Sequence, residues 1–135
     1  MATALKTETL PIQSDSDIVL VRQRVRAWSL EQKFSLVDQT KLITAASELA
    51  RNTLEHGRGG HMRMDLVMNG SRSGLRLCFE DSGPGIADVQ MALRDGFSTG
   101  GGMGLGLSGS KRLVNEFEIH SELNKGTKVT VTRWK

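Results

Sequence analysis

The spacing of the apolar residues changes near residue 57, and this change most constrains how the chain folds. Before it, apolar residues recur at intervals of three and four, which predicts two helices that each bury one face. After it, apolar and polar residues alternate over two pairs of segments, which predicts strands with one buried face. The chain is therefore expected to combine helices and a sheet in one domain over residues 1–135.

The two long helices have recognisable starts. The first is expected to begin at a capping Ser16 or Asp17, and its buried face comprises Ile18, Val21, Val25 and Trp28. Arginines on its other side fit either an ordinary solvated face or a surface for an acidic partner: Arg22, Arg24 and Arg26. Ser35 and Asp38 resemble a capping box that opens the second helix, which Gly57 should end.

The alternating segments predict two β-hairpins. The segments 61–69 and 74–81 flank the turn "NGSRSG", and 117–123 and 127–134 flank "NKG". The start of the chain should be frayed over residues 1–7 and then form an edge strand. A short helix is expected within 87–95, a flexible loop at 96–102, and a third long helix from about 104 to 115.

Together these elements predict an α/β (α+β) fold. Antiparallel strands that bury one face are readily covered by helices on that side. The expected architecture is a two-layer sandwich, with a mixed, mostly antiparallel sheet covered on one face by helices.

Composition excludes several classes of protein. The 18 Lys and Arg against 15 Asp and Glu give a net charge of +3, which selects no particular anionic ligand. Aromatic residues make up 4% of the chain, so we expect no nucleic-acid partner that binds by base stacking. A single cysteine, Cys78, and the absence of a secretory or membrane-spanning pattern predict a cytoplasmic protein that does not associate with membranes. The three histidines show no zinc spacing.

Two polar residues on the second helix are candidates for phosphate chemistry. Glu48 and Asn52 are four residues apart, so they lie on one helix face. An amide oxygen suits Mg²⁺, which takes most of its other ligands from phosphate and water. A carboxylate one turn away can accept a proton from an attacking hydroxyl. Taken alone, the pair is weak evidence, because Glu and Asn on a helix are usually just solvated.

The stretch "EDSGPGI" places a carboxylate and two glycines directly after a strand. Asp81 can accept a hydrogen bond from an exocyclic amine such as that of adenine, and Gly83 and Gly85 allow the backbone to approach a flat base closely. A tight turn after an edge strand is the alternative. In the last hairpin, Thr127 can place a hydroxyl near the same base.

A second glycine cluster precedes the predicted third helix. Closely spaced glycines before a helix expose backbone N–H groups that can hold phosphates, and such a loop can also close over a nucleotide. No Walker or dinucleotide-binding pattern is present. The candidate phosphate and lid residues are Gly100, Gly101, Gly102, Met103, Gly104, Leu105, Gly106 and Leu107.

In order, "ELARN", "EDSGPGI", "GGMGLGL" and "KGTKVTV" resemble the N box, the two glycine boxes and the closing threonine motif of the GHKL ATPases. The chain is most similar to the small serine/threonine kinases of bacterial partner switching, the RsbT-like switch kinases of the stressosome. The resemblance covers nearly the whole chain from about residue 8. It implies a Bergerat-type, histidine-kinase-like fold that uses ATP and Mg²⁺.

The resemblance also implies the residue roles and the partners. Asn52 would ligate Mg²⁺, Glu48 would act as base, and Asp81 would bind the adenine amine. Gly83 and Gly85 would shape the base pocket, residues 100–107 would form the lid and phosphate contacts, and Thr127 would support adenine. The γ-phosphate would pass to a serine or threonine of a STAS-domain antagonist, and the kinase would then bind and activate a serine phosphatase.

Two other functions remain open at this stage. An anti-sigma factor with kinase activity would sequester a sigma factor and phosphorylate the antagonist that releases it. A nucleotide-binding scaffold without turnover is the third hypothesis, against which stand the intact Glu48, Asn52 and Asp81.

Overall fold

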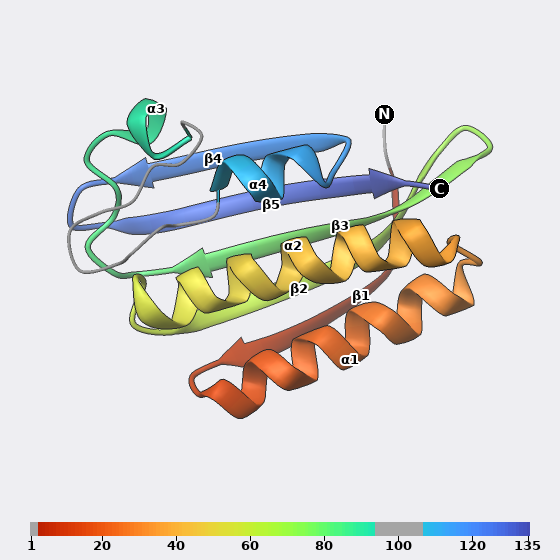
Figure 1. Ribbon diagram of the computed structural model, residues 1–135, viewed down its shortest axis with the longest axis horizontal. Coiled ribbons are helices and arrows are strands. Elements are labelled where there is room, and N and C mark those ends of the chain that lie inside the picture. Colours follow the sequence, from red (N-terminus) through yellow and green to blue (C-terminus); the bar gives the residue numbers. More distant parts are fainter. Residues whose placement is uncertain (1–2, 94–106) are drawn as a thin grey trace.

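The computed structural model describes residues 3–93 and 107–135, which form a single layer of strands covered by helices (Figure 1). The five strands make one sheet in the order β1-β2-β3-β5-β4, and every described pairing is antiparallel. The strands are β1 (Thr3–Ile12), β2 (Gly60–Asn69), β3 (Arg72–Asp81), β4 (Glu116–Glu122) and β5 (Gly126–Trp134).

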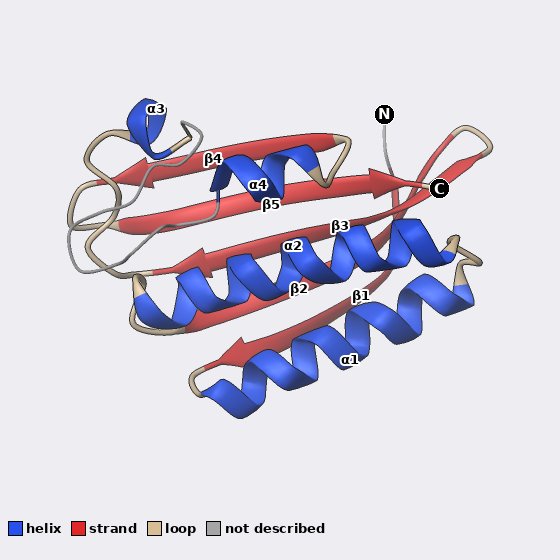
Figure 2. Ribbon diagram, viewed as in Figure 1, coloured by secondary structure: helices blue, strands red, loops and turns tan. Residues whose placement is uncertain are grey.

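The helices lie on the same face of this sheet, as Figure 2 shows for α1, α2 and α4. The described helices are α1 (Asp15–Glu31), α2 (Leu36–Glu55), α3 (Val89–Ala92) and α4 (Leu107–Arg112). Helix α2 packs on α1, on α4 and on the middle of the sheet. The expected two-layer sandwich is therefore confirmed, with antiparallel pairing throughout the described strands in place of the mixed sheet.

The core follows from strand alternation and register. Met62 pairs with Phe79, and Met64 with Leu77, so four large side chains project from neighbouring strands to the same face. These side chains are at most 2% exposed and pack against the apolar stripe of α2. Their burial is the main force that holds α2 over the end of β3, where the candidate site residues lie.

The opposite sheet face buries a carboxylate beside apolar side chains such as Val67. Asp65, only 2% exposed, accepts hydrogen bonds from the Thr7 hydroxyl at 2.8 Å and from the Arg76 guanidinium at 3.0 Å. A buried carboxylate is tolerated there because its oxygens are paired. Cys78, 4% exposed, lies on the same face.

The helix starts differ in how well the sequence located them. For α2, the Ser35 side chain accepts from the Asp38 N–H at 3.1 Å, so the expected cap is present. For α1, the expected cap at Ser16 or Asp17 is wrong, because the N-cap is Ser14. Asp17 instead accepts from the Gln13 N–H at 2.8 Å, which satisfies the chain just before the helix.

Three other boundaries differ from the expected ones. Strand β1 already pairs at Thr3 with Met68, so the described residues among 1–7 are ordered by β2 rather than frayed. The first hairpin turn is shorter than "NGSRSG", since Asn69 still pairs with Arg72. Helix α4 ends at Arg112, short of the expected residue 115, while 94–106 lie outside the described residues.

Candidate adenine-nucleotide site

A small cavity forms where the second half of α2 faces the ends of β3 and β5. Apolar side chains make most of its wall, and a few polar groups converge on it, as in a small-molecule site. Its lining residues are Leu49, Asn52, Thr53, His56, Phe79, Asp81, Ile86, Leu107, Thr127 and Val129. The free volume is about 20 Å³, room for one water molecule, so a purine would enter only if lining side chains move.

Four of the residues that the sequence selected thus share one cavity: Asn52, Asp81, Leu107 and Thr127. Helix α2 supplies the amide, β3 the carboxylate, and β5 the hydroxyl. They come together because β3 and β5 are neighbours, with Asp81 directly opposite Thr127, and because α2 packs on β3.

Asp81 is held by backbone donors on one of its two oxygens. Its Oδ1 accepts from the Gly83 N–H at 2.9 Å and from the Thr127 N–H at 3.3 Å. Among the described residues, no hydrogen bond reaches Oδ2, which leaves that oxygen for a ligand donor. Burial raises the pKa of Asp81, and this rise is opposed by those two N–H groups and by the nearby His56.

Glycine is required where α2 ends beside this carboxylate. A Cβ on Gly57 would lie 2.3 Å from Asp81 Cγ, and one on Gly83 would lie 2.7 Å from the Gly57 Cα. Neither contact is possible for a side-chain carbon. The pair of glycines therefore lets helix, strand and loop close around Asp81.

The loop after β3 is fixed by hydrogen bonds from three elements. His56 Nε2 lies 3.1 Å from the Gly85 carbonyl oxygen, and Gly85 has φ +76°, which favours glycine. The Ile86 N–H donates to Ser121 Oγ at 2.7 Å, and the Asn124 N–H donates to the Pro84 carbonyl at 2.7 Å. One wall of the cavity is thus preorganised for a ligand.

Comparison with known proteins decides the family. Residues 37–135 match the model of the histidine kinase-, DNA gyrase B- and HSP90-like ATPase family. The chain belongs to this family. It is also 42% identical over 91% of its length to the serine/threonine-protein kinase RsbT of Bacillus subtilis, of which it covers 92%. Anti-sigma F factors of Clostridium kluyveri are 26% identical over 83% of the chain, which covers 82% of their length.

Solved structures share the fold of this ATPase. The RsbU and RsbW domains of Rv1364c from Mycobacterium tuberculosis match 96% of the chain with a TM-score of 0.64 and 21% identity. The chain spans about a third of the length of that structure, 33%. The catalytic domain of histidine kinase ThkA matches with a TM-score of 0.51, 14% identity, and 96% and 95% coverage of the two chains.

As a member of the family, the chain is an ATP-using domain, and among the cavity residues Asn52 is the candidate to hold a metal ion. Asn52 supplies an amide oxygen, the hard type of donor that Mg²⁺ accepts. Glu48, one turn earlier on α2, is exposed and lies outside the cavity lining. No cluster of three or more His, Cys, Asp or Glu side chains that could hold a metal ion occurs in residues 3–93 and 107–135.

Other sequence-selected positions of the ATPase lie partly outside the described residues. Leu107 is 2% exposed at the start of α4 and lines the cavity. The remaining lid candidates lie outside: Gly100, Gly101, Gly102, Met103, Gly104, Leu105 and Gly106. Residues that the sequence analysis missed are His56, Gly57 and Ser121. Only the "EHG" that ends α2 hinted at the first two.

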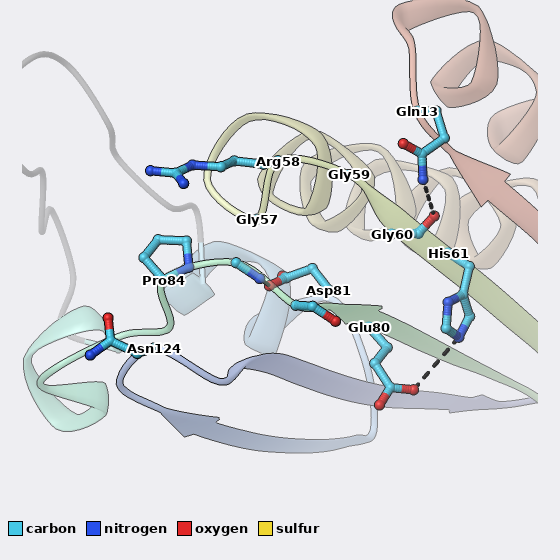
Figure 3. Close-up of a pocket in the computed structure, with 12 residues that line it drawn as sticks. Gln13, Gly57, Arg58, Gly59, Gly60, His61, Glu80, Asp81, Pro84 and Asn124 are labelled. Carbon is cyan, nitrogen blue, oxygen red and sulfur yellow. Dashed lines mark hydrogen bonds and ion pairs between the residues drawn. The ribbon is translucent and has the colours of Figure 1, made fainter.

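A larger hollow lies on the other side of Asp81 (Figure 3). Its volume is about 750 Å³, and polar groups line it, including Arg58 and an ion pair of 3.6 Å between His61 and Glu80. Asp81 contributes to both spaces. The hollow lacks the apolar walls that a purine needs, and neither Asn52 nor Thr127 lines it. The small cavity is therefore the better candidate for the nucleotide site, although its free volume is smaller.

Within the described residues, no helix is both long and apolar enough to cross a membrane.

Proposed function

We propose that the chain is an ATP-dependent protein serine/threonine kinase that phosphorylates a STAS-domain antagonist in a stressosome-type partner switch in the cytoplasm. After release from that substrate it binds and activates a serine phosphatase. The observation that carries the proposal is that Asn52 and Asp81 line one cavity. The 42% identity to a serine/threonine-protein kinase over most of both chains supports the reaction class.

The proposed roles follow from donor chemistry. Asp81 Oδ2 accepts from the adenine amine, Thr127 supports the base, and the loop with Gly83 and Gly85 forms the base wall. Asn52 would ligate Mg²⁺, which when bound neutralises phosphate charge. Leu107 and the preceding segment from Gly100 to Gly106 form the lid and phosphate contacts.

Glu48 is proposed as the general base. Its carboxylate takes the proton from the acceptor hydroxyl as the oxygen attacks the γ-phosphorus, and the bond to the β,γ-bridging oxygen breaks, leaving ADP. The exposure of Glu48 suits this role, because the acceptor belongs to a separate protein and must reach the base from outside. Alignment and charge neutralisation supply most of the remaining rate enhancement.

The test is phosphate transfer from γ-labelled ATP with Mg²⁺ to a purified STAS-domain partner. Glu48→Ala should keep ATP affinity within about twofold and reduce transfer at least about 100-fold. Glu55→Ala, which removes an exposed glutamate of α2, is the matched control and should remain active. Undiminished transfer by Glu48→Ala would exclude Glu48 as base.

The second candidate function is an anti-sigma factor with kinase activity. The 26% identity to anti-sigma F factors over 83% of the chain favours it. The anti-sigma function is the second candidate because the identity to the kinase is higher, at 42%. Capture of partners from the native cytoplasm with and without Mg-ATP separates the two functions. A sigma factor among the bound proteins would favour the anti-sigma function. A phosphorylated STAS protein, captured without a sigma factor, would favour the switch kinase.

A further inference from the structure

Ser121 of the edge strand β4 makes three polar contacts although it does not line the small cavity. Its Oγ accepts from the Ile86 N–H at 2.7 Å, lies 2.8 Å from Thr127 Oγ1, and lies 3.2 Å from the Gly126 carbonyl oxygen. The first contact holds the base-wall loop, and the second reaches a hydroxyl that does line the cavity. Ser121 therefore connects the wall of the pocket to one of its polar groups.

The direction of these hydrogen bonds follows from counting protons. A hydroxyl has one proton and two acceptor positions, and the Ile86 N–H occupies one of the latter. The Gly126 carbonyl can only accept, so pairing it requires the Ser121 proton. The remaining acceptor position of Ser121 then receives the Thr127 proton. All three contacts are satisfied only in this arrangement.

With its proton directed to Ser121, Thr127 presents only lone pairs to the cavity. The other polar group beside it, Asp81, has an ionised carboxylate that also only accepts, and its Oδ1 is already engaged by Gly83 and Thr127 N–H groups. A ligand group at this corner must therefore donate. A 6-amino group of a purine offers two N–H donors, whereas a 6-oxo group offers an acceptor.

We propose that Ser121 is a positioning residue that makes the site specific for 6-aminopurine nucleotides by fixing the Thr127 hydroxyl as an acceptor. This inference rests on the proposed nucleotide-binding function. It predicts that freeing the Thr127 hydroxyl lets it rotate and donate to a 6-oxo group. Discrimination is then lost even though no residue in contact with the base has changed.

The experiment measures dissociation constants of ATP and inosine triphosphate, whose bases differ in the 6-amino and 6-oxo groups and in the N1 proton that accompanies the latter. The wild-type chain is expected to prefer ATP by about 100-fold, and Ser121→Ala to reduce that preference to about 10-fold. Ser121→Thr keeps a hydroxyl and should restore part of the preference. His120→Ala, at the neighbouring residue of β4 on the opposite sheet face, is the control and should retain it.

A second variant covers the case in which Ser121→Ala fails to fold. Thr127→Val removes the hydroxyl itself and should lower the ATP preference by a similar factor. In the double variant the loss should not increase further, which shows that the two residues act through one group. An unchanged preference in Ser121→Ala or in Thr127→Val, with ATP still bound by wild type, overturns the inference. Failure of the wild-type chain to bind ATP would instead overturn the proposed function.

Discussion

At the scale of single residues, the site depends on a glycine, where a side chain must be absent, as much as on its polar side chains. Gly57 lies two residues after the end of α2 and next to the Asp81 carboxyl, with no room for a methyl group between them. Any side chain there would push the carboxylate off its two backbone donors. This constraint on Gly57 is independent of the nucleotide, yet it determines where the Asp81 oxygen that is proposed to bind the base points.

We therefore predict that Gly57→Ala damages both stability and nucleotide binding. The new Cβ would overlap Asp81 Cγ, at 2.3 Å, so relief costs about 1–3 kcal/mol of unfolding free energy and weakens ATP binding at least about tenfold. Denaturant unfolding and calorimetric titration measure the two effects. Gly109→Ala is the matched control, because its Cβ meets nothing within 4 Å on α4, and it should leave ATP affinity unchanged. Wild-type ATP affinity in Gly57→Ala would refute the argument.

The sequence located the residues whose chemistry is visible in a motif and missed those defined by contacts. Asn52, Asp81 and Thr127 stand in short patterns with recognisable donor types, so the sequence alone was enough to select them. Ser121 could not be selected in this way, because its role arises from the pairing of β4 with β5, which places it opposite Thr127. His56 acts through a carbonyl 29 residues away, at Gly85.

At the scale of elements, one arginine of the last strand ties three elements together. Arg133 donates to Asp38 Oδ1 at 2.6 Å, in the first turn of α2, and to the Leu113 carbonyl at 3.0 Å, just after α4. Its side chain is 14% exposed and that of Asp38 is 29% exposed. The pair therefore lies where water screens it only partly, and it fixes both helices that border the cavity.

This pair predicts a pH dependence of stability. The hydrogen bond from Arg133 lowers the pKa of Asp38 below its ordinary value of 3.8. A lowered carboxyl pKa means that the stabilisation is complete above about pH 4 and is lost as pH falls through the folded-state pKa. Asp38→Asn should cost about 1–2 kcal/mol at pH 7, and the difference from wild type should shrink as the pH falls below the ordinary carboxyl pKa of 3.8.

Chemical denaturation at several pH values measures this difference. Asp15→Asn is the control, because Asp15 is an 88% exposed carboxylate in the first turn of α1, 3.9 Å from Arg51. Its replacement should change stability by less than about 0.5 kcal/mol at any pH. A constant difference between wild type and Asp38→Asn over the whole pH range would show that the carboxylate charge contributes nothing.

Helices and strands could be predicted because the spacing of apolar residues along the sequence indicates which face of each element is buried. Both hairpins and both long helices have the expected type, since Met62, Met64 and Leu77 alternate as one buried sheet face requires. Boundaries were less predictable. The α1 cap is Ser14 rather than Ser16 or Asp17, because all three are plausible caps and the choice depends on where β1 ends. Pairing with β2, which orders β1 from Thr3, is a tertiary effect that no local pattern shows.

At the scale of the whole molecule, the cavity joins parts that are distant along the chain. Asn52 belongs to the helical layer, whereas Asp81 and Thr127 belong to the sheet. A nucleotide bound between them would therefore link the two layers, and unfolding of either layer would release it. Ligand binding and global stability should then be coupled.

We predict that Mg-ATP at about 100 times its dissociation constant stabilises the chain by about 2.7 kcal/mol, a rise in melting temperature of about 9 °C. Differential scanning calorimetry with ATP alone and with ATP and Mg²⁺ separates the contributions. Asp81→Asn should lose the shift under both conditions, because the amine loses its charged acceptor. Asn52→Ala should retain the shift with ATP alone and lose the additional part due to Mg²⁺.

Glu80→Gln is the control for the carboxylate, because Glu80 neighbours Asp81 in sequence but is exposed on the opposite sheet face, where it pairs with His61. Its Mg-ATP shift should equal that of wild type. Equal shifts in Asp81→Asn and Glu80→Gln would mean that nucleotide binding does not depend on the Asp81 carboxylate and that the nucleotide binds elsewhere. Loss of the whole shift in Asn52→Ala would place the amide in contact with the nucleotide itself, because a purely metal-bound amide cannot affect binding of ATP without metal.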